Sequence, residues 1–235
     1  TLPLFEKLVG REPVSLVSLM DHSPGQRQFA NIEKYREYYQ GKYSLSDEEM
    51  ARYEEEQLAL AAQWSQPNRL SIAALCRDRN IALASHDDAT HDHVLESHQL
   101  GSVIAEFPTT FEAAEASRKH GMNVLMGAPN IVRGGSHSGN VAASQLASLG
   151  LLDILSSDYY PASLLDAAFR VADDEHNPFT LPQAIRLVTK NPATALNLHD
   201  RGEIAEGKRA DLVLAHRKGE HIHIDHVWRQ GKRVF

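Results

Sequence analysis

Five short apolar runs, each ending in polar residues, constrain the fold of this chain more than any other feature. The runs are rich in Val, Ile, Leu and Ala, which is typical of parallel strands that are covered on both faces. A stretch with a helical pattern follows each of them. The alternation predicts an α/β fold with right-handed crossovers between parallel strands. The runs cover residues 14–22, 81–88, 102–108, 123–130 and 151–161.

Capping residues predict where the helices between these runs begin. Ser46 and Glu49 have the spacing of a capping box, so a helix is expected directly after Ser46. Pro67 is expected to open a second helix, which would end at Arg79. A further helix is expected to begin near Gly139.

The composition limits the partners of the chain. Its 235 residues, 42% of them hydrophobic, are enough to bury a substantial core. The net charge of −7 argues against a nucleic acid or an anionic membrane as partner. Cys76 is the only cysteine, which excludes an internal disulfide and suits a reducing compartment, so a cytoplasmic location is expected. No apolar stretch reaches the ~20 residues that a membrane-spanning helix needs.

Reactive residues at the carboxyl ends of successive parallel strands are typical of the active site of a (β/α)8 barrel. Five units cannot close such a barrel, so residues 1–199 are predicted to be its C-terminal part, preceded by about three further units. An open, doubly wound sheet of five strands is the alternative. Residues 200–235 alternate apolar and polar positions between turn signals, which predicts three or four short antiparallel strands.

His22, His86 and Asp158 each end a predicted strand and are candidate metal ligands. Imidazole and carboxylate groups suit Zn²⁺ and similar ions. Asp87 and Asp88 follow His86 directly. They are expected either to orient the imidazole of His86 or to bind hydroxyl groups of a substrate. Asp88 is equally well placed to cap the helix that follows.

The segment NIVRGGSHSGN, residues 130–140, is a candidate phosphate-binding loop. An arginine provides a planar fork of donors for phosphate oxygens, and glycines let backbone N–H groups approach closely. The dipole of the helix expected near Gly139 would favour an anion. The candidate phosphate-binding residues are Arg133, Gly134, Gly135, Ser136 and Ser138.

Several segments together resemble the amidohydrolase superfamily and, within it, the PhnM-like hydrolases of the carbon–phosphorus lyase pathway. The tail GEIAEGKRADLVL, residues 202–214, is similar to the small β-sandwich that many amidohydrolases append to their barrel. The other matching segments are SLMDHSPGQRQF (18–29), ASHDDAT (84–90), IAEFPTTFEAA (104–114), GAPNIVRGGSHSGN (127–140) and SSDYYPASLL (156–165).

The resemblance implies a (β/α)8 TIM barrel of amidohydrolase type, with residues 200–235 as part of a β-sandwich. It also implies a divalent metal, Zn²⁺ or alternatively Mn²⁺, in a site that holds one ion or two. Asp158 matches the aspartate that binds metal in this family and accepts the proton of the attacking water. The His-x-His pair and the acidic ligand of the family have no match, because they belong to its first and third strands. The chain is therefore expected to correspond to a C-terminal part and to be inactive by itself.

The reaction implied by the resemblance is hydrolysis of the 5-triphosphate of α-D-ribose 1-methylphosphonate, with release of diphosphate, in phosphonate catabolism. The expected partner is thus a small phosphorylated sugar, and an oligomer of identical chains is possible. A hydrolase of C–N bonds from the same superfamily, of the N-acyl amino-acid deacylase type, is one alternative. An inactive binding or scaffold subunit is the other.

Overall fold

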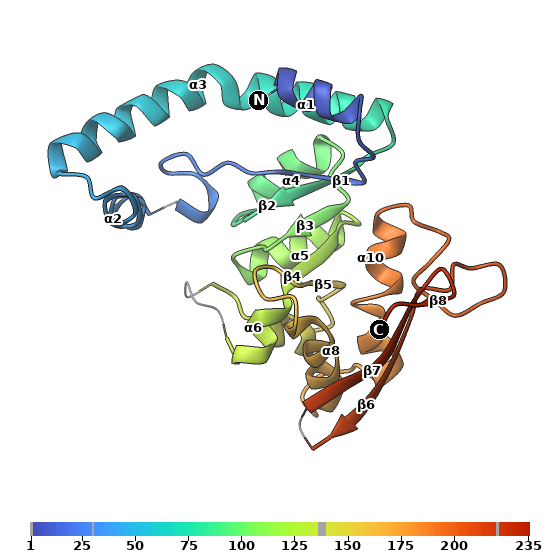
Figure 1. The fold of residues 1–235 in the computed structure, drawn as a ribbon. Coiled ribbons are helices and arrows are strands. Elements are labelled where there is room, and N and C mark those ends of the chain that lie inside the picture. Colours follow the sequence, from blue (N-terminus) through green and yellow to red (C-terminus); the bar gives the residue numbers. More distant parts are fainter. Residues whose placement is uncertain (1, 30, 136–139, 220) are drawn as a thin grey trace. The chain divides into compact units, whose positions relative to one another are not determined.

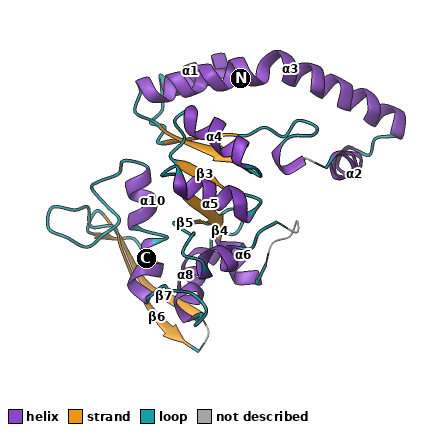
Figure 2. Ribbon diagram, turned by 180° about the vertical axis from the view of Figure 1, so that it is seen from behind, coloured by secondary structure: helices purple, strands orange, loops and turns teal. Residues whose placement is uncertain are grey.

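The computed structural model describes residues 2–29, 31–135, 140–219 and 221–235 of the chain. The chain divides into two compact units, residues 1–122 and 123–235, called here the first and the second unit. The ribbon in Figure 1 follows the chain through both units, and Figure 2 shows the same helices and strands from behind.

The first unit contains three parallel strands. They are β1 (Leu16–Leu19), β2 (Ala82–His86) and β3 (Ile104–Glu106). β2 pairs with both neighbours, and its register places His86 directly opposite Glu106. All five residues of β2 are buried, as expected for a central strand that is covered on both faces.

Helices connect these strands. The long helix α3 begins at the predicted capping box, since Ser46 accepts a hydrogen bond from the Glu49 N–H and the Glu49 side chain bonds the Ser46 N–H. The predicted second helix from Pro67 is wrong, because Pro67 lies inside α3. A proline removes one backbone hydrogen bond and can bend a helix without ending it, and α3 is one continuous curved helix in Figure 1. The helices of this unit are α1 (Leu2–Val9), η1 (Arg27–Phe29), α2 (Ile32–Tyr43), α3 (Asp47–Asp78), α4 (His91–Gln99) and α5 (Phe111–Lys119).

The core of the first unit lies between its sheet and its helices. Leu19 of β1 and Leu83 of β2 form a buried cluster with Ile72 and Cys76 of α3. Leu2 and Phe5 of α1 pack against the same cluster, and α1 lies along α3 in both views (Figures 1 and 2). This packing fixes α3 beside the strands that carry the candidate metal ligands.

The second unit begins with two parallel strands, β4 (Asn123–Gly127) and β5 (Ile154–Ser156). The N–H of Leu155 in β5 donates to the carbonyl of Leu187, which ties the strand to the helical segment that follows. The helices are α6 (Ala128–Arg133), α7 (Ala143–Ser148), α8 (Ser163–Asp173), α9 (Leu181–Arg186) and α10 (Lys190–Ala195).

The end of the second unit is an antiparallel sheet of three strands, β6 (Leu212–Lys218), β7 (His221–Arg229) and β8 (Lys232–Arg233). This confirms the antiparallel strands expected within residues 200–235. The boundary predicted between residues 199 and 200 stays a prediction. It lies between the last helix, which ends at Ala195, and β6.

All five predicted parallel strands are present, each within the expected apolar run, so the α/β architecture is confirmed. Each strand is followed by at least one helix. Among the described helices, none combines the length and the apolar character that crossing a bilayer requires.

Candidate metal centre

His22, His86 and Asp87 form a compact cluster in the first unit. Their ligand atoms all lie within 4.8 Å of one another. The Asp87 Oδ2 atom lies 3.3 Å from the His86 Nε2 atom and 3.5 Å from the His22 Nε2 atom. The structure therefore brings together two of the three predicted ligands, and it adds Asp87 to them.

The backbone after β2 aims the Asp87 carboxylate at the two imidazoles. His86 is the last residue of β2, and Asp87 has a φ of 56°, in the left-handed region. Asp enters this region more readily than most residues. The N–H of Asp87 donates to the carbonyl of Glu106 at 3.0 Å, which anchors the turn to β3.

Glu106, the last residue of β3, contacts the other side of the His86 ring. Its Oε2 atom lies 2.7 Å from His86 Nδ1 and accepts a hydrogen bond from the Ser18 hydroxyl at 2.5 Å. Burial opposes a charge on His86, but the bond to Glu106 and the charge of Asp87 outweigh it and raise the pKa of His86 above its ordinary value. Burial likewise opposes the Glu106 carboxylate, yet the bonds from His86 and Ser18 hold its pKa below the ordinary value. Both groups thus favour the charged form.

The cluster fits a divalent transition metal. Two imidazole nitrogens and a carboxylate oxygen are a donor set that suits Zn²⁺. The Nε2 atom of His22 is buried and, among the described residues, has no hydrogen-bond partner. A buried polar atom normally has such a partner, so the Nε2 atom of His22 is available to a metal ion.

Asp88 is buried in an ion-pair network, and its contact with the substrate stays a prediction. Its carboxylate pairs with Arg27, and both side chains are almost fully buried. Burial is the main influence on the pKa of the Arg27 guanidinium and lowers it to about 10. The group therefore stays charged at neutral pH. Arg27 also reaches Glu96 of α4 at 3.3 Å. Thr90 caps α4, so the capping role considered for Asp88 is wrong.

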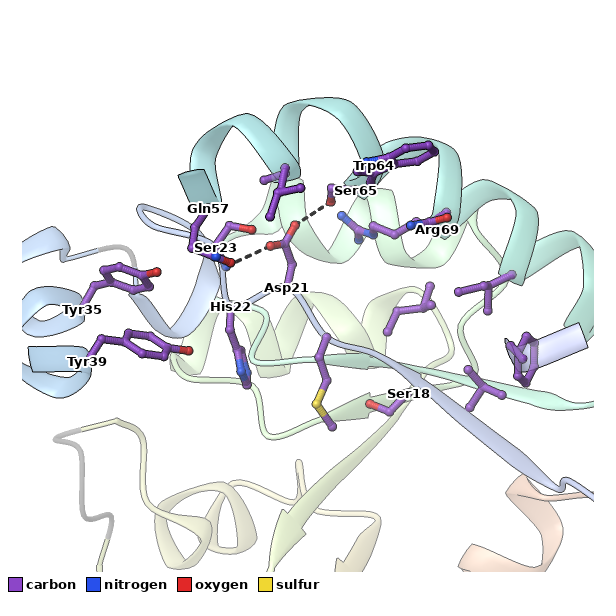
Figure 3. Close-up of a pocket in the computed structure, with 18 residues that line it drawn as sticks. Ser18, Asp21, His22, Ser23, Tyr35, Tyr39, Gln57, Trp64, Ser65 and Arg69 are labelled. Carbon is purple, nitrogen blue, oxygen red and sulfur yellow. Dashed lines mark hydrogen bonds between the residues drawn. The ribbon is translucent and has the colours of Figure 1, made fainter. Parts of the chain in front are cut away.

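Asp21 ties the segment that carries His22 to helix α3. Its carboxylate accepts hydrogen bonds from the Ser65 hydroxyl at 2.8 Å and from the Ser23 N–H at 3.1 Å (Figure 3). The Asp21 side chain points toward α3, whereas the His22 ring points away from it (Figure 3). Asp21 therefore helps to hold His22 in place without joining the cluster.

A cavity of 570 Å³ lies between β1 and α3, with His22 in its wall (Figure 3). Every residue from Val17 to Ser23 lines it, so it runs along β1. Among the described strands β1 pairs with β2 alone, and the backbone at a strand edge offers unpaired N–H and C=O groups. The cavity is a groove beside that edge rather than a pocket closed around the cluster.

Asp158 belongs to the second unit, where it follows β5 with a φ of 48°. Its carboxylate packs over Gly127 at the end of β4, since a Cβ atom added to Gly127 would lie 3.2 Å from Asp158 Oδ2. The ends of β4 and β5 thus build the surroundings of Asp158. Its approach to His22 and His86 remains a prediction.

The candidate phosphate-binding loop is partly helical. Residues up to Arg133 belong to α6, and Gly134 ends that helix with a φ of 80°. The N–H groups of Gly134 and Gly135 already donate to carbonyls of α6, which leaves Arg133 as the stronger candidate donor. Arg133 donates to the hydroxyl of Tyr159, next to Asp158. Ser136 and Ser138, like the predicted helix start near Gly139, lie outside the described residues.

Sequence reasoning identified both histidines but missed the contacts that orient them. Ser18 stands inside an apolar run, where a hydroxyl is unusual, and that is the one signal that pointed to it. Glu106 ends a predicted strand and could be expected to reach the metal or the substrate, but Pro108 turns the chain directly after it, so it ranked below Asp158. Which group it contacts depends on the register of β2 and β3, which no local pattern provides.

The chain is similar to one known protein family and to three individual proteins. The model of the amidohydrolase family matches residues 78–235. A protein of Escherichia coli (strain K12) called alpha-D-ribose 1-methylphosphonate 5-triphosphate diphosphatase is 88% identical over 235 residues, which is 100% of this chain and 62% of that protein. This chain therefore spans less than two thirds of the length of that relative.

Two adenine deaminases are more distant relatives. The one from Gluconobacter oxydans (strain 621H) is 28% identical over 174 residues, or 69% of this chain and 30% of that protein. The one from Ligilactobacillus salivarius (strain UCC118) is 34% identical over 110 residues, or 45% of this chain and 18% of that protein.

Proposed function

This chain belongs to the amidohydrolase family, and on that premise we propose that it serves the metal-dependent hydrolysis of the 5-triphosphate of α-D-ribose 1-methylphosphonate, with release of diphosphate. The observation that carries the metal-dependent part is the cluster of His22, His86 and Asp87. The substrate rests on the relative that is 88% identical and whose name states this reaction.

The residues that would hold the metal are His22, His86 and Asp87 of the first unit. Asp158 is a further proposed ligand, which rests on the family resemblance. A bound divalent ion lowers the pKa of water to about 7 and polarises a phosphoryl oxygen. Nitrogen and oxygen donors support Zn²⁺, with Mn²⁺ as the alternative, in a site of one ion or two.

The chain's own groups supply the remaining chemistry. Asp158 accepts the proton of the attacking water, and the packing of its carboxylate over Gly127 supports a fixed position for that step. Arg133 stabilises the charge on the departing diphosphate, and the hydrogen bond to Tyr159 supports its place beside Asp158. The single buried thiol, Cys76, supports a reducing compartment, and we place the reaction in the cytoplasm.

Hydrolysis of a C–N bond is the second candidate. The two adenine deaminase relatives favour it, and a metal centre of the same kind serves both reactions. Their identity of 28% and 34% is far below the 88% of the diphosphatase, and Arg133 supports an anionic substrate.

The test is a rate measurement on the purified full-length protein loaded with Zn²⁺ or Mn²⁺. Diphosphate release from the ribose triphosphate is followed beside ammonia release from adenine. The proposal expects diphosphate release that stops when the metal is chelated and falls at least about 100-fold in His86→Ala. Ammonia release from adenine without diphosphate release would establish the second candidate instead.

A further inference from the structure

We propose that Glu106, itself held by Ser18, is a positioning residue that fixes the ring and the tautomer of His86 for metal binding. This inference rests on the proposed metal centre and goes beyond it, because it assigns a role to two residues outside the ligand set. The carrying observation is that one carboxylate oxygen, Glu106 Oε2, contacts both the Ser18 hydroxyl and His86 Nδ1.

The strand register creates this arrangement. His86 and Glu106 are direct partners in the parallel pair of β2 and β3, so their side chains leave the sheet at the same point. Ser18 comes from β1, on the other side of β2. Three neighbouring strands thus each contribute one member of the chain of contacts from Ser18 through Glu106 to His86.

Burial makes the contact between Glu106 and His86 strong and specific. The two side chains are 17% and 11% exposed, so little water competes for either partner. A hydrogen bond that involves a charged group is about twice as strong as a neutral one, and its geometry is correspondingly better defined. The Ser18 hydroxyl fixes the carboxylate from a second direction and limits its rotation.

The tautomer of His86 follows from the contact. A carboxylate accepts hydrogen bonds, so His86 must carry its proton on Nδ1 when it is neutral. The lone pair of the ring then lies on Nε2, the nitrogen that faces Asp87 Oδ2 at 3.3 Å. In known metal sites a carboxylate placed in this way orients the ring and makes the histidine a better ligand.

A direct ligand role for Glu106 fits the geometry less well. Its Oε2 atom already serves two partners, and Glu106 is not a member of the cluster formed by His22, His86 and Asp87. The two roles differ in the effect of glutamine, which can accept a hydrogen bond from Nδ1 but is a poor metal ligand. Glutamine at position 106 should therefore preserve a positioning role and abolish a ligand role.

The first experiment compares zinc affinity in the metal-free purified protein by competition with a chromophoric chelator. Glu106→Ala is expected to weaken zinc binding about 10- to 100-fold, and Glu106→Gln and Ser18→Ala less than about 10-fold. The matched control is Asp225→Ala. It removes a carboxylate that contacts Nδ1 of another histidine, His216, outside the cluster, and it should leave zinc affinity unchanged.

The second experiment reads the tautomer itself by ¹⁵N NMR of the His86 ring, above the pH at which the ring loses its charge. The parent protein is expected to show the proton on Nδ1, and Glu106→Ala a shift toward the proton on Nε2. A role in packing alone would change the melting temperature of the metal-free protein without moving this signal.

The outcomes separate this inference from the proposed function. If His86→Ala binds zinc as tightly as the parent, the metal centre itself is wrong. If His86→Ala loses zinc while Glu106→Ala keeps both the zinc affinity and the tautomer, only the positioning role is overturned. An equal, severe loss in Glu106→Ala and Glu106→Gln would make Glu106 a ligand and also overturn the positioning role.

Discussion

At the scale of single residues, three of the parallel strands are followed by a residue with a positive φ. Asp87 after β2, Phe107 after β3 and Asp158 after β5 all have φ values between 48° and 56°. A residue other than glycine in this region is strained, and such strain gathers at functional sites where the surroundings hold it. Here it turns the chain sharply at each strand end, and two of the three residues are aspartates of the candidate site.

Asp87 allows its two contributions, backbone and carboxylate, to be measured separately. Asn tolerates the left-handed region as Asp does but carries no charge, so Asp87→Asn should weaken zinc binding with little change in the free energy of unfolding. Asp87→Ala should lose the same affinity and also destabilise the protein by about 1 kcal/mol. Zinc titration and urea unfolding of the metal-free variants measure the two effects. Zinc affinity equal to the parent's in Asp87→Asn would remove Asp87 from the ligand set.

Cys76 provides a residue-scale test of the packing between α3 and the sheet. The side chain is buried in the core cluster with Leu19 and Leu83, and burial raises the pKa of its thiol. A thiol reagent at pH 8 should therefore react with the native protein at least about 100-fold more slowly than with the unfolded chain. A native rate close to the unfolded rate would show that this core opens readily.

The candidate ligands were the part of the site that local sequence could predict. His22 and His86 stand out because each follows an apolar run, and parallel strands bring such ends together. The roles of Glu106 and Asp88 could not be predicted in this way. The first depends on strand register, and the second depends on a buried partner, Arg27, that lies 61 positions away along the chain.

At the scale of elements, the capping box predicted a helix start correctly, whereas the proline did not. The capping box at Ser46 is present as predicted, but no helix begins at Pro67, which lies inside α3, while the predicted end at Arg79 matches the C-cap of α3. Burial of Ile72 and Cys76 against the strands holds the C-terminal half of α3 in the same helix, and tertiary packing of this kind outweighs local propensity. Helix α6 was missed because its sequence, with two glycines directly after it, suggested a loop.

The start of α3 can be tested by removing its cap. Ser46→Ala deletes the side chain that accepts the Glu49 N–H and should lower the free energy of unfolding by about 1 kcal/mol. Glu48→Ala is the control, since this neighbour lies in the first turn without belonging to the capping box. Urea unfolding compares the two variants. An equal loss in both would mean that first-turn charge, and not the capping box, supports the helix start.

The packing of β4 against the Asp158 loop makes a second prediction at this scale. Gly127 has a φ of −73°, so alanine is allowed by its backbone, but the added Cβ would press on the Asp158 carboxylate. Gly127→Ala should therefore lower diphosphate release about 10-fold or more while the fold persists. Gly41→Ala, in helix α2 with no atom within 4 Å of the added Cβ, is the control. Full activity in Gly127→Ala would show that catalysis does not depend on the position of the Asp158 carboxylate.

At the scale of the whole molecule, the order of strands and helices was predictable because it follows from the spacing of apolar runs. The arrangement confirms an α/β chain with an appended antiparallel sheet, and the amidohydrolase family match covers both kinds of structure. The chain spans 62% of its relative from Escherichia coli, and the reaction of that relative is carried to this chain as a proposal.

The most direct test of the account is an equilibrium zinc titration of the metal-free full-length protein and of its double variant His22→Ala/His86→Ala. The account predicts that the parent binds at least one zinc ion per chain. It predicts that the double variant loses this binding, since two of the three clustered ligand atoms are gone. Metal-free melting temperatures establish that both proteins are folded. Zinc bound with equal stoichiometry and affinity by both proteins would contradict a metal centre at His22, His86 and Asp87.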